Sequence, residues 1–377
     1  MTLITYLTRV HFADGVLEEA IWSEFEAANK RRPMVLFDRK NLPQDQTERF
    51  LSSVPGRVEF VEFSDIPNVP DERSARSAAT LYNAKNCDVL MAFGTARTID
   101  LAKATRVAIK HDEPLTKFAY SRGGSKRIGT DLPDLFAAPD ISGCGSAVSA
   151  HAPIIMANGE RALLMCKKLI PTVTVCDPTL TLAADQMSSA SAGADAITQC
   201  VEAYLSKSYN PPAEGIALDG LRRAVTNVGT VLNNGNDIFA RREMMAASLN
   251  GALAVQKGLG ASQAISNALE AVCEFAIRPG VLNRIVLPSV LRFNRTKIEA
   301  KFDPIRTVFA LDTQADVPNA VQAFLEKLPL PRRFSELGVE RSHLEAAAPV
   351  AAFDLATGTN PRALGQKDYL DIMRSVH

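Results

Sequence analysis

The sequence predicts an α/β domain, in which helices cover both faces of a parallel sheet, followed by an all-helical domain. The first half alternates short apolar runs with helical stretches, which is typical of a parallel sheet. From about Leu180 onward, apolar residues recur at helical spacing instead. The 377 residues allow about two domains of roughly 150 residues each. We place them at 1–178 and 179–377, because Asp177-Pro178 interrupts the pattern.

Composition narrows the class of protein. Lys plus Arg and Asp plus Glu both number 42, so no global basic field favours nucleic acid or an anionic membrane as a partner. No apolar run approaches the roughly 20 residues of a membrane-spanning helix, and no basic start precedes an apolar run. The six cysteines include no CxxC pair, which suits a reducing compartment. We therefore expect a cytoplasmic globular protein.

Apolar runs in the first half are expected to be strands. They are 34–37, 58–63, 87–93 and 173–177. The third run breaks at Gly94 and continues as a helix through 101–104. Such a turn directs free backbone N–H groups and the positive end of the helix dipole at one point, which favours a bound phosphate.

Two further features of the first half favour a nucleotide. Asp38 ends the first predicted strand, where its carboxylate can accept hydrogen bonds from a ribose diol. The segment 139–147 is rich in small residues, so a ligand can approach its backbone closely. Asp38 repels a 2′-phosphate and therefore favours NAD, whereas Arg39 and Lys40 would bind that phosphate if Asp38 turned away.

Proline and glycine divide the helical half. The expected helices are 195–206, 213–231, 240–253 and 261–275, followed by three or four more. Pro279-Gly280 and Pro288 are expected to break the helical run, and a final short helix is expected after Asn360-Pro361-Arg362.

Two segments of this half, 191–204 and 258–270, are predicted to be core-facing helices that each carry a polar stripe. The stripes consist of Asp195, Gln199 and Glu202 in the first segment and of Gln263, Asn267 and then Glu270 or Glu274 in the second. Paired helices with coordinating side chains at i and i+4 are how a helical bundle builds an interior metal site. Three of the four i, i+4 positions hold amides, which are poor ligands for a transition metal.

Several separate motifs occur in a fixed order along the chain. They are Asp177-Pro-Thr-Leu180, Gly193-Ala-Asp-Ala196 with Glu202-Ala-Tyr204, Gly258-Leu-Gly260, Leu287-Pro288 with Arg292-Phe-Asn294, and Asn360-Pro-Arg362. Together they resemble the iron-containing (group III) alcohol dehydrogenase family, which includes maleylacetate reductases, over nearly the whole chain. The resemblance implies a dehydroquinate synthase-like fold with an NAD(P)-binding domain and a helical domain. It also implies a homodimer that acts on a small-molecule substrate.

In that family the helical domain normally holds one divalent metal ion by one Asp and three His. Carried over residue by residue, the Asp falls on Asp195, but the three His fall on Gln199, Gln263 and Pro279. A neighbouring family His becomes Asn267. None of the histidines of the chain lies near enough in sequence to these positions to replace a missing ligand. They are His11, His111, His151, His343 and His377. We therefore predict that no catalytic metal binds.

The family's cofactor loops are altered as well. Its Gly-Gly-Gly-Ser-x-x-Asp loop falls on 94–100, which keeps the first Gly and the Asp. Its Pro-Thr-Thr-x-Gly-Thr-Gly-Ser-Glu loop falls on 139–147, which loses both Thr and the final Glu. Arg97 can supply a charged phosphate contact in place of the lost glycine amides. The predicted residues that bind NAD or NADP are Asp38, Gly94, Thr95, Ala96, Arg97, Asp100, Ser142, Gly143, Gly145 and Ser146.

The missing ligands decide which chemistry is expected. In the family the metal polarises the reacting carbonyl or alkoxide oxygen. Without it, Gln199, Gln263 and Asn267 would form an oxyanion pocket beside Asp195, or else a structural amide network that fills the old metal cavity. His151 occupies a position where the family has a nicotinamide-pocket residue and is the predicted proton donor, because histidine titrates near neutral pH. The alternative is a structural histidine under a loop.

These expectations give a metal-independent NAD(P)H-dependent reductase or dehydrogenase of a small carbonyl or alcohol. A non-catalytic binding or assembly relative, and an enzyme shifted to non-redox chemistry at the same site, are the alternatives. Arg278, Arg284 and Arg292 lie in a segment that borders the family's cleft, where they would favour an acidic substrate. Ordinary exposed arginines are the alternative for these three residues.

Overall fold

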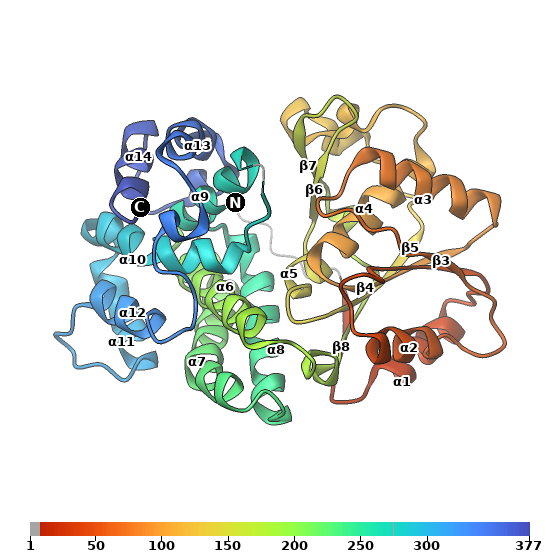
Figure 1. The fold of residues 1–377 in the computed structure, drawn as a ribbon, viewed down its shortest axis with the longest axis horizontal. Helices are drawn as coiled ribbons and strands as arrows, with labels where there is room; N and C mark the ends of the chain where they lie inside the picture. Colours follow the sequence, from red (N-terminus) through yellow and green to blue (C-terminus); the bar gives the residue numbers. More distant parts are fainter. Residues whose placement is uncertain (1–7, 274) are drawn as a thin grey trace. The chain divides into compact units, whose positions relative to one another are not determined.

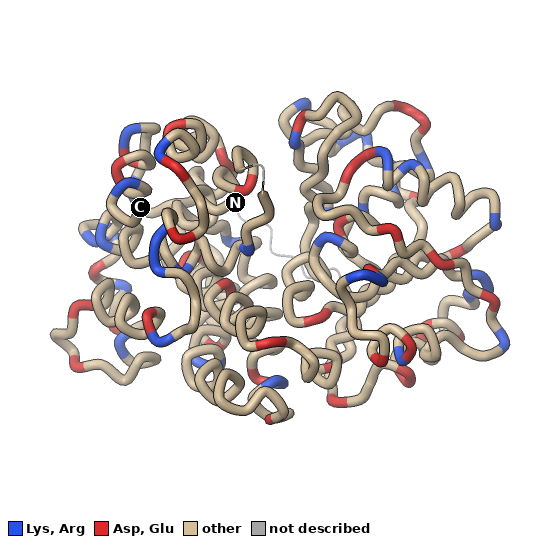
Figure 2. The backbone as a smooth tube through the Cα atoms, viewed as in Figure 1, with Lys and Arg blue, Asp and Glu red and all other residues tan. Residues whose placement is uncertain are grey.

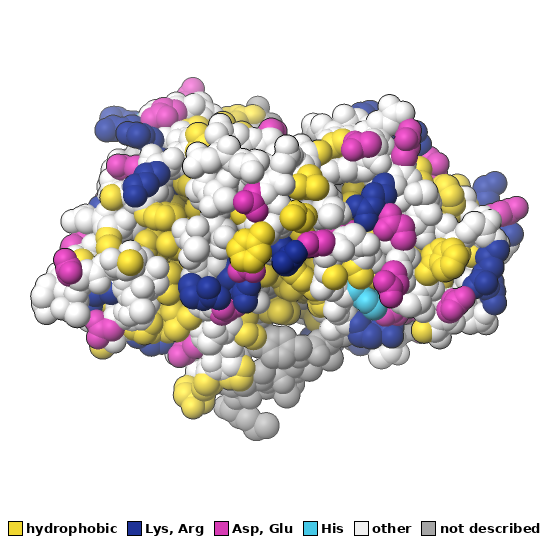
Figure 3. Space-filling view, turned by 90° about the horizontal axis from the view of Figure 1, so that it is seen from below, with side chains coloured by type: hydrophobic (Ala, Val, Ile, Leu, Met, Phe, Trp, Pro, Cys, Tyr) yellow, Lys and Arg dark blue, Asp and Glu magenta, His cyan; other side chains and the backbone are white. Residues whose placement is uncertain are grey.

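The computed structural model describes residues 8–273 and 275–377 (Figure 1). The described chain divides into two compact units, 8–183 and 184–377. Lys and Arg alternate with Asp and Glu along both units (Figure 2), and charged and apolar side chains are interspersed on the face in Figure 3. Among the described helices, none is both long and apolar enough to cross a membrane.

The first unit is built on a parallel six-stranded sheet, as predicted. Its strand order is β1-β8-β5-β4-β2-β3. The strands are β1 (Arg9–Phe12), β2 (Pro33–Phe37), β3 (Val61–Phe63), β4 (Val89–Gly94), β5 (Asp134–Pro139) and β8 (Val173–Cys176), and β6 (His151–Ile155) pairs with β7 (Arg161–Met165) in a separate antiparallel hairpin. Each of the four predicted runs contains a strand, although β3 covers only 61–63 of the run 58–63, and the other four strands were not expected.

Helices cover both faces of this sheet. They are α1 (Leu17–Ala27), α2 (Gln44–Ser52), α3 (Glu72–Ala84), α4 (Ala96–Lys110) and α5 (Cys144–Val148). Met34 and Leu36 of β2 join one apolar core with α3 and α4, while Val35 and Phe37 join the other with α1 and α2. Because successive side chains of a strand point to opposite faces, β2 is apolar throughout. The predicted α/β arrangement is confirmed.

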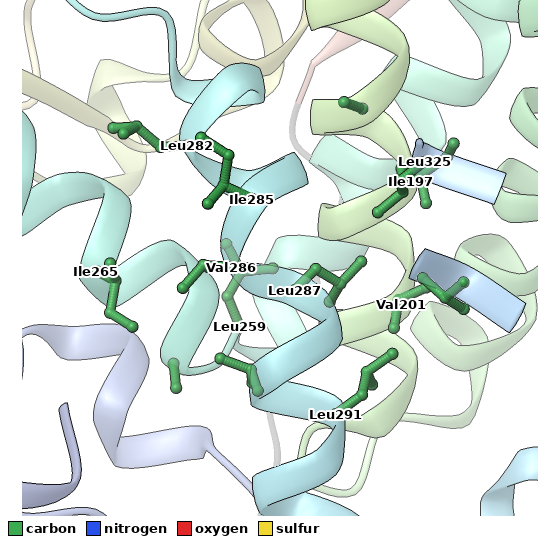
Figure 4. Close-up of a cluster of buried hydrophobic side chains, with 14 of the residues drawn as sticks. Ile197, Val201, Leu259, Ile265, Leu282, Ile285, Val286, Leu287, Leu291 and Leu325 are labelled. Carbon is green, nitrogen blue, oxygen red and sulfur yellow. The ribbon is translucent and has the colours of Figure 1, made fainter. Parts of the chain in front are cut away.

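The second unit is helical in its described part. Its helices are α6 (Gln186–Leu205), α7 (Pro211–Asn233), α8 (Ile238–Ala254), α9 (Ala261–Val272), α10 (Pro279–Ile298), α11 (Phe302–Val308), α12 (Val317–Leu325), α13 (Arg341–Phe353) and α14 (Gln366–Arg374). Figure 4 shows their shared core, to which α10 contributes more of the labelled side chains than any other helix. Ile197 and Val201 of α6 face Leu287 and Leu291 of α10 there.

One expectation about this unit is wrong. Pro288 does not break the helical run, because α10 continues through it. A proline inside a helix costs roughly 3 kcal/mol. Here the buried side chains on either side, Leu287 and Leu291, pack into the core and offset that cost. Pro279 instead lies in the first turn of α10, where its missing N–H has no helical partner to lose.

The crossing of α6 and α10 is unusually close. A Cβ atom on Gly280 would lie 1.9 Å from the backbone oxygen of Ser191, so only glycine fits there. This approach brings the following turn of α10, with Asn283, against the following turn of α6, with Asp195. The packing of two helices therefore determines which side chain meets the surviving carboxylate.

Candidate active site

The turn from β4 into α4 has the geometry predicted for a phosphate site. Gly94 adopts a φ of +110°, which L side chains rarely do. Thr95 precedes Ala96, the first residue of α4, without a side-chain cap, and its hydroxyl oxygen is buried with no hydrogen-bond partner among the described residues. The first-turn N–H groups of a helix lack intrahelical acceptors. These groups fit a cofactor phosphate.

The second predicted loop lies directly against this turn. A Cβ atom on Gly143 would come within 2.2 Å of the Gly94 backbone oxygen, whereas one on Gly145 would meet nothing within 4 Å. Ser142 is exposed and donates to Asp140 through its backbone N–H (2.8 Å) and its hydroxyl (3.0 Å). The close approach at Gly143 therefore holds the two cofactor loops together. Residues 144–148 form the short helix α5 rather than open loop.

Asp100 lies inside the first unit rather than on the surface of the turn. It is 5 % exposed, and its Oδ1 atom lies 3.3 Å from the Nζ atom of Lys103. Burial raises the pKa of Asp100. The charge of Lys103 and a hydrogen bond with Ser146 lower it, but by less than burial raises it. Asp100 and Ser146, both predicted to bind cofactor, connect α4 to α5 through a side-chain hydrogen bond.

Lys103 was not singled out from the sequence. Its fully buried ammonium also donates to the Ser149 hydroxyl (2.9 Å) and to the His151 backbone oxygen (2.8 Å). Burial lowers its pKa, and the carboxylate of Asp100 opposes this effect. Lys103 lies on a helix that is buried around most of its circumference, which the mixed polar and apolar sequence of α4 does not reveal.

Asp38 and Arg97, predicted as separate ribose and phosphate contacts, are brought together by the fold. The Nη2 atom of Arg97 lies 3.1 Å from the Oδ2 atom of Asp38, and Asn41 donates to the same oxygen at 2.8 Å. Only 1 % of Asp38 is exposed. The neighbouring Arg39 and Lys40 form ion pairs with carboxylates of their own, so neither is an unpaired receptor for a 2′-phosphate.

His151, at the start of β6, does not titrate near neutral pH as expected. Burial, together with the charge of Lys103, lowers its pKa to about 4. Its imidazole is therefore neutral at pH 7, and the premise for its role as proton donor is wrong. A neutral ring can still donate one N–H hydrogen bond.

Asp195, where the family has its metal-binding carboxylate, has both oxygens occupied by amide donors. Gln199, one turn along α6, donates to Oδ2 at 2.9 Å, and Asn283 of α10 donates to Oδ1 at 2.7 Å. Burial raises the pKa of Asp195 to about 6, and the hydrogen bond from Asn283 opposes this shift. Asn283 was not predicted, because nothing in the local sequence connects it to α6.

Gln263 and Asn267 form a second amide network on α9. The Gln263 amide donates to Asn267 at 2.8 Å, and Asn267 donates to Asp354 at 3.0 Å. The Oε1 atom of Gln263 is buried without a hydrogen-bond partner in the described chain. Within the described residues, no hydrogen bond joins Gln199 to Gln263.

The third members of the two polar stripes have other roles. Glu202 accepts hydrogen bonds from the backbone N–H groups of Gly260 (2.9 Å), Ser262 (2.7 Å) and Gln263 (3.2 Å). Its carboxylate therefore binds the N-terminus of α9, where the helix dipole favours a negative charge. Glu270 accepts from Ser266 at 3.4 Å, and Glu274 lies outside the described residues.

The donor set beside Asp195 does not suit a transition metal. Within 8–273 and 275–377, no three His, Cys, Asp or Glu side chains gather closely enough to hold an ion. The polar groups around Asp195 are amides whose hydrogens point at the carboxylate. Zinc and iron in such sites take imidazole, thiolate or carboxylate ligands, so these residues do not fit either ion.

Comparisons with known proteins agree with the fold. The family model for iron-containing alcohol dehydrogenase matches residues 8–178, and the model for the C-terminal part of that family matches 189–377. A 4-hydroxybutyrate dehydrogenase of Cupriavidus necator is 35% identical over 376 residues, covering 98% of each chain.

Solved structures give the same picture. A crystal structure of 1,3-propanediol oxidoreductase superposes with a TM-score of 0.91 at 22% identity over 100% of both chains. A sulfoacetaldehyde reductase from Bifidobacterium kashiwanohense, in complex with NAD+, gives 0.88 at 18% identity over 100% of this chain and 98% of its own. At these identities the likeness establishes the fold.

Proposed function

Because the chain belongs to the iron-containing alcohol dehydrogenase family and is an NAD(P)-dependent oxidoreductase, we propose that it interconverts a small alcohol and its carbonyl compound without a catalytic metal. The pair of amide donors on Asp195 carries this proposal. An ion at that carboxylate would have to displace Gln199 from one oxygen and Asn283 from the other. No remaining imidazole or thiolate would compensate for those lost hydrogen bonds.

We propose a short hydroxy acid as the alcohol substrate. The relative from Cupriavidus necator acts, by its name, on 4-hydroxybutyrate, and its likeness to this chain extends over 98% of both proteins. Oxidation of the terminal hydroxyl of such a substrate gives an aldehyde that still carries a carboxylate. We also propose that the enzyme works as a homodimer, which sedimentation velocity at several protein concentrations would test.

Asp195 is the group proposed to move the proton. When bound, NAD(P)H supplies a hydride to the carbonyl carbon, and the carbonyl oxygen takes up a proton. Asp195 has a pKa of about 6 and therefore holds a proton in a useful fraction of molecules near neutral pH. After the proton leaves, the Gln199 and Asn283 amides stabilise the carboxylate that remains.

The turn after β4 is proposed to hold the cofactor's phosphates. The Thr95 hydroxyl and the first N–H groups of α4 are the donors available there. Both NAD and NADP stay open as cofactors, with NAD favoured because Asp38 occupies the position that would repel a 2′-phosphate.

Metal analysis and a metal-site graft test the proposal together. Protein purified without chelator should contain far less than one zinc or iron per chain, and its NADH-linked reduction of the 4-carbon aldehyde acid should survive EDTA. The variant Gln199→His/Gln263→His/Pro279→His should gain metal affinity. One metal per parent chain, with activity lost to chelator and restored by metal, would contradict the proposal.

Nucleotide binding distinguishes an enzyme from a non-catalytic relative. A ligand at 100 times its dissociation constant should add about 2.7 kcal/mol of stability. NADH or NADPH should therefore raise the melting temperature. If neither nucleotide changes it, the chain is a binding or assembly relative instead.

A further inference from the structure

A cavity in the second unit is strongly basic and belongs to no part of the proposed catalytic site. Its volume is about 310 Å³, and it lies among α10, α12, the segment 331–333 and the end of α14. Its charged lining residues are Arg284, Arg292, Arg332, Arg333 and Glu326. Four arginines against one glutamate leave an excess of three positive charges, in a chain whose formal net charge is zero.

The carboxylates near these arginines act on them only through their charge, as Glu326 and Glu336 do on Arg284. Within the described residues, none of the four forms an ion pair. Arg292 donates instead to the neutral side chains of Asn319 and Gln322. The one carboxylate of the lining, Glu326, accepts a hydrogen bond from Gln322 at 2.8 Å and not from an arginine. Glu326 therefore offsets only part of the positive charge of the cavity.

Arg284 shows this most clearly. It is 4 % exposed, and its Nε and Nη1 atoms donate to the backbone oxygens of Leu325 (3.2 Å) and Pro331 (2.8 Å). Its Nη2 atom is buried with no acceptor in the described part of the chain. The two carbonyl oxygens account for a structural role of Arg284, because Leu325 ends α12 and its carbonyl needs a donor. They do not account for the Nη2 atom, which leaves a buried cation with one unsatisfied nitrogen.

The sequence had suggested that Arg284 and Arg292 favour an acidic substrate or are simply exposed. Arg284 is buried, and it extends from α10 toward α12 and Pro331, whereas the preceding Asn283 extends toward Asp195 of α6. The arginines and Asp195 therefore lie on different faces of α10, so the basic cavity is not part of the proposed proton-transfer site.

We infer that this cavity binds a small phosphate monoester. Arginine forks match phosphate oxygens with paired hydrogen bonds, and arginines that form no ion pair retain that capacity. The volume lies at the lower end of the range for small-molecule sites, which excludes a folded partner as the occupant. The lining contains no aromatic side chain on which a base could stack, so a nucleotide is a poor fit.

The apolar side of the cavity favours an ester over free phosphate. Ile285, Leu325 and Val376 also line it and can cover a short carbon chain. Burying a methylene group there adds about 0.8 kcal/mol, so a carbon chain should strengthen binding several-fold. Ser289 and Ser375 offer hydroxyls to the remaining polar atoms of the ligand.

Calorimetric titration of the full chain with glycerol 3-phosphate and with inorganic phosphate tests this inference. Saturating NADH is present throughout, so that phosphate binding at the turn after β4 does not contribute. One site per chain is expected, with the ester bound more tightly than phosphate. No binding of either probe, or tighter binding of inorganic phosphate, would overturn the assignment.

Variants locate the site. Arg332→Gln/Arg333→Gln changes two exposed side chains, so it should leave the fold and the turnover intact and weaken the ester at least tenfold. The matched control is Arg222→Gln, which removes an exposed arginine of α7 outside the cavity lining and should change the affinity less than twofold. Equal effects of both variants would show a general charge effect and refute the site. The comparison of the variants depends on phosphate affinity and not on whether Asp195 transfers the proton.

Discussion

Asn283 lies against Asp195 across the α6–α10 crossing, with 2.7 Å between its Nδ2 atom and the Oδ1 atom of the carboxylate. The contact gives this carboxylate oxygen a neutral hydrogen-bond donor. Burial nevertheless dominates, and the pKa of Asp195 stays near 6. The remaining carboxylate is therefore a group that changes its protonation in the working range of most enzymes.

Asp195→Asn should stabilise the protein at alkaline pH. The folded-state pKa of about 6 lies above the ordinary value of 3.8, so the parent's extra stability is complete below pH 3.8 and is lost as pH rises through 6. That loss amounts to about 3 kcal/mol. The free energy of unfolding of the variant minus that of the parent should therefore increase by about this amount from pH 4 to pH 8. Urea denaturation at each pH measures this difference.

The same helix supplies a control of opposite sign. Asp185 caps the N-terminus of α6, where the backbone N–H of Ser188 holds its pKa below the ordinary value. The stability that Asp185 contributes is present above pH 3.8 and is lost on acidification. As pH rises from 3 to 6, the free energy of unfolding of Asp185→Asn should therefore decrease relative to that of the parent. Equal pH dependence of the two variants would contradict the assigned shifts.

Asn283→Leu should move the pH profile of carbonyl reduction. The hydrogen bond from Asn283 favours the ionised form of Asp195, so its removal raises that pKa above 6. If Asp195 gives the proton, kcat/KM of the parent falls as pH rises through about 6, and the fall in the variant shifts to higher pH. An unshifted profile with unchanged NADH affinity would exclude Asp195 from proton transfer.

His151→Gln distinguishes the other candidate. With a pKa of about 4, the imidazole is already neutral above pH 5. Its ionisation therefore causes no change of turnover with pH in that range. The variant should lower turnover, if at all, without changing the shape of the pH profile between pH 5 and 9. A limb that disappears with the histidine would restore its role as proton donor.

Asp38→Ser should shift cofactor preference toward NADPH. In the parent, Arg97 is paired with Asp38 at 3.1 Å, so its charge is not available to a 2′-phosphate. Removing the carboxylate leaves Arg97 free to bind that phosphate and removes a repulsive charge. The ratio of kcat/KM for NADPH to that for NADH should rise at least tenfold. Adding Arg97→Gln should abolish the gain; a gain that persists would exclude Arg97 as the phosphate contact.

Gly143→Ala should destabilise the first unit by about 1–3 kcal/mol, because its Cβ would clash with the Gly94 backbone oxygen at 2.2 Å. Weaker NADH binding should accompany this loss, since the turn after β4 must move. Gly145→Ala is the matched control, with nothing within 4 Å of the added methyl group. It should change the free energy of unfolding by less than about 0.5 kcal/mol. Similar losses in both variants would dismiss the close contact as their cause.

Much of the architecture is local and therefore readable from the chain. Strands buried on both faces, such as β2, are continuously apolar, and this pattern is visible without coordinates. The pairs Asp195–Gln199 and Gln263–Asn267 are also local, because residues four apart on a helix face each other.

The tertiary structure decided the rest, because the contacts in question join residues far apart in sequence. Asn283 meets Asp195 across 88 residues, through a helix crossing that only Gly280 permits. Arg97 reaches Asp38 from a different strand–helix unit, and burial rather than residue type set the pKa values of His151 and Asp195. Sequence alone indicated some side chains of the site, such as Asp195 and Gln199, but not Asn283 or Lys103. Packing determined which of them meet and, through desolvation, which of them can hold a proton near neutral pH.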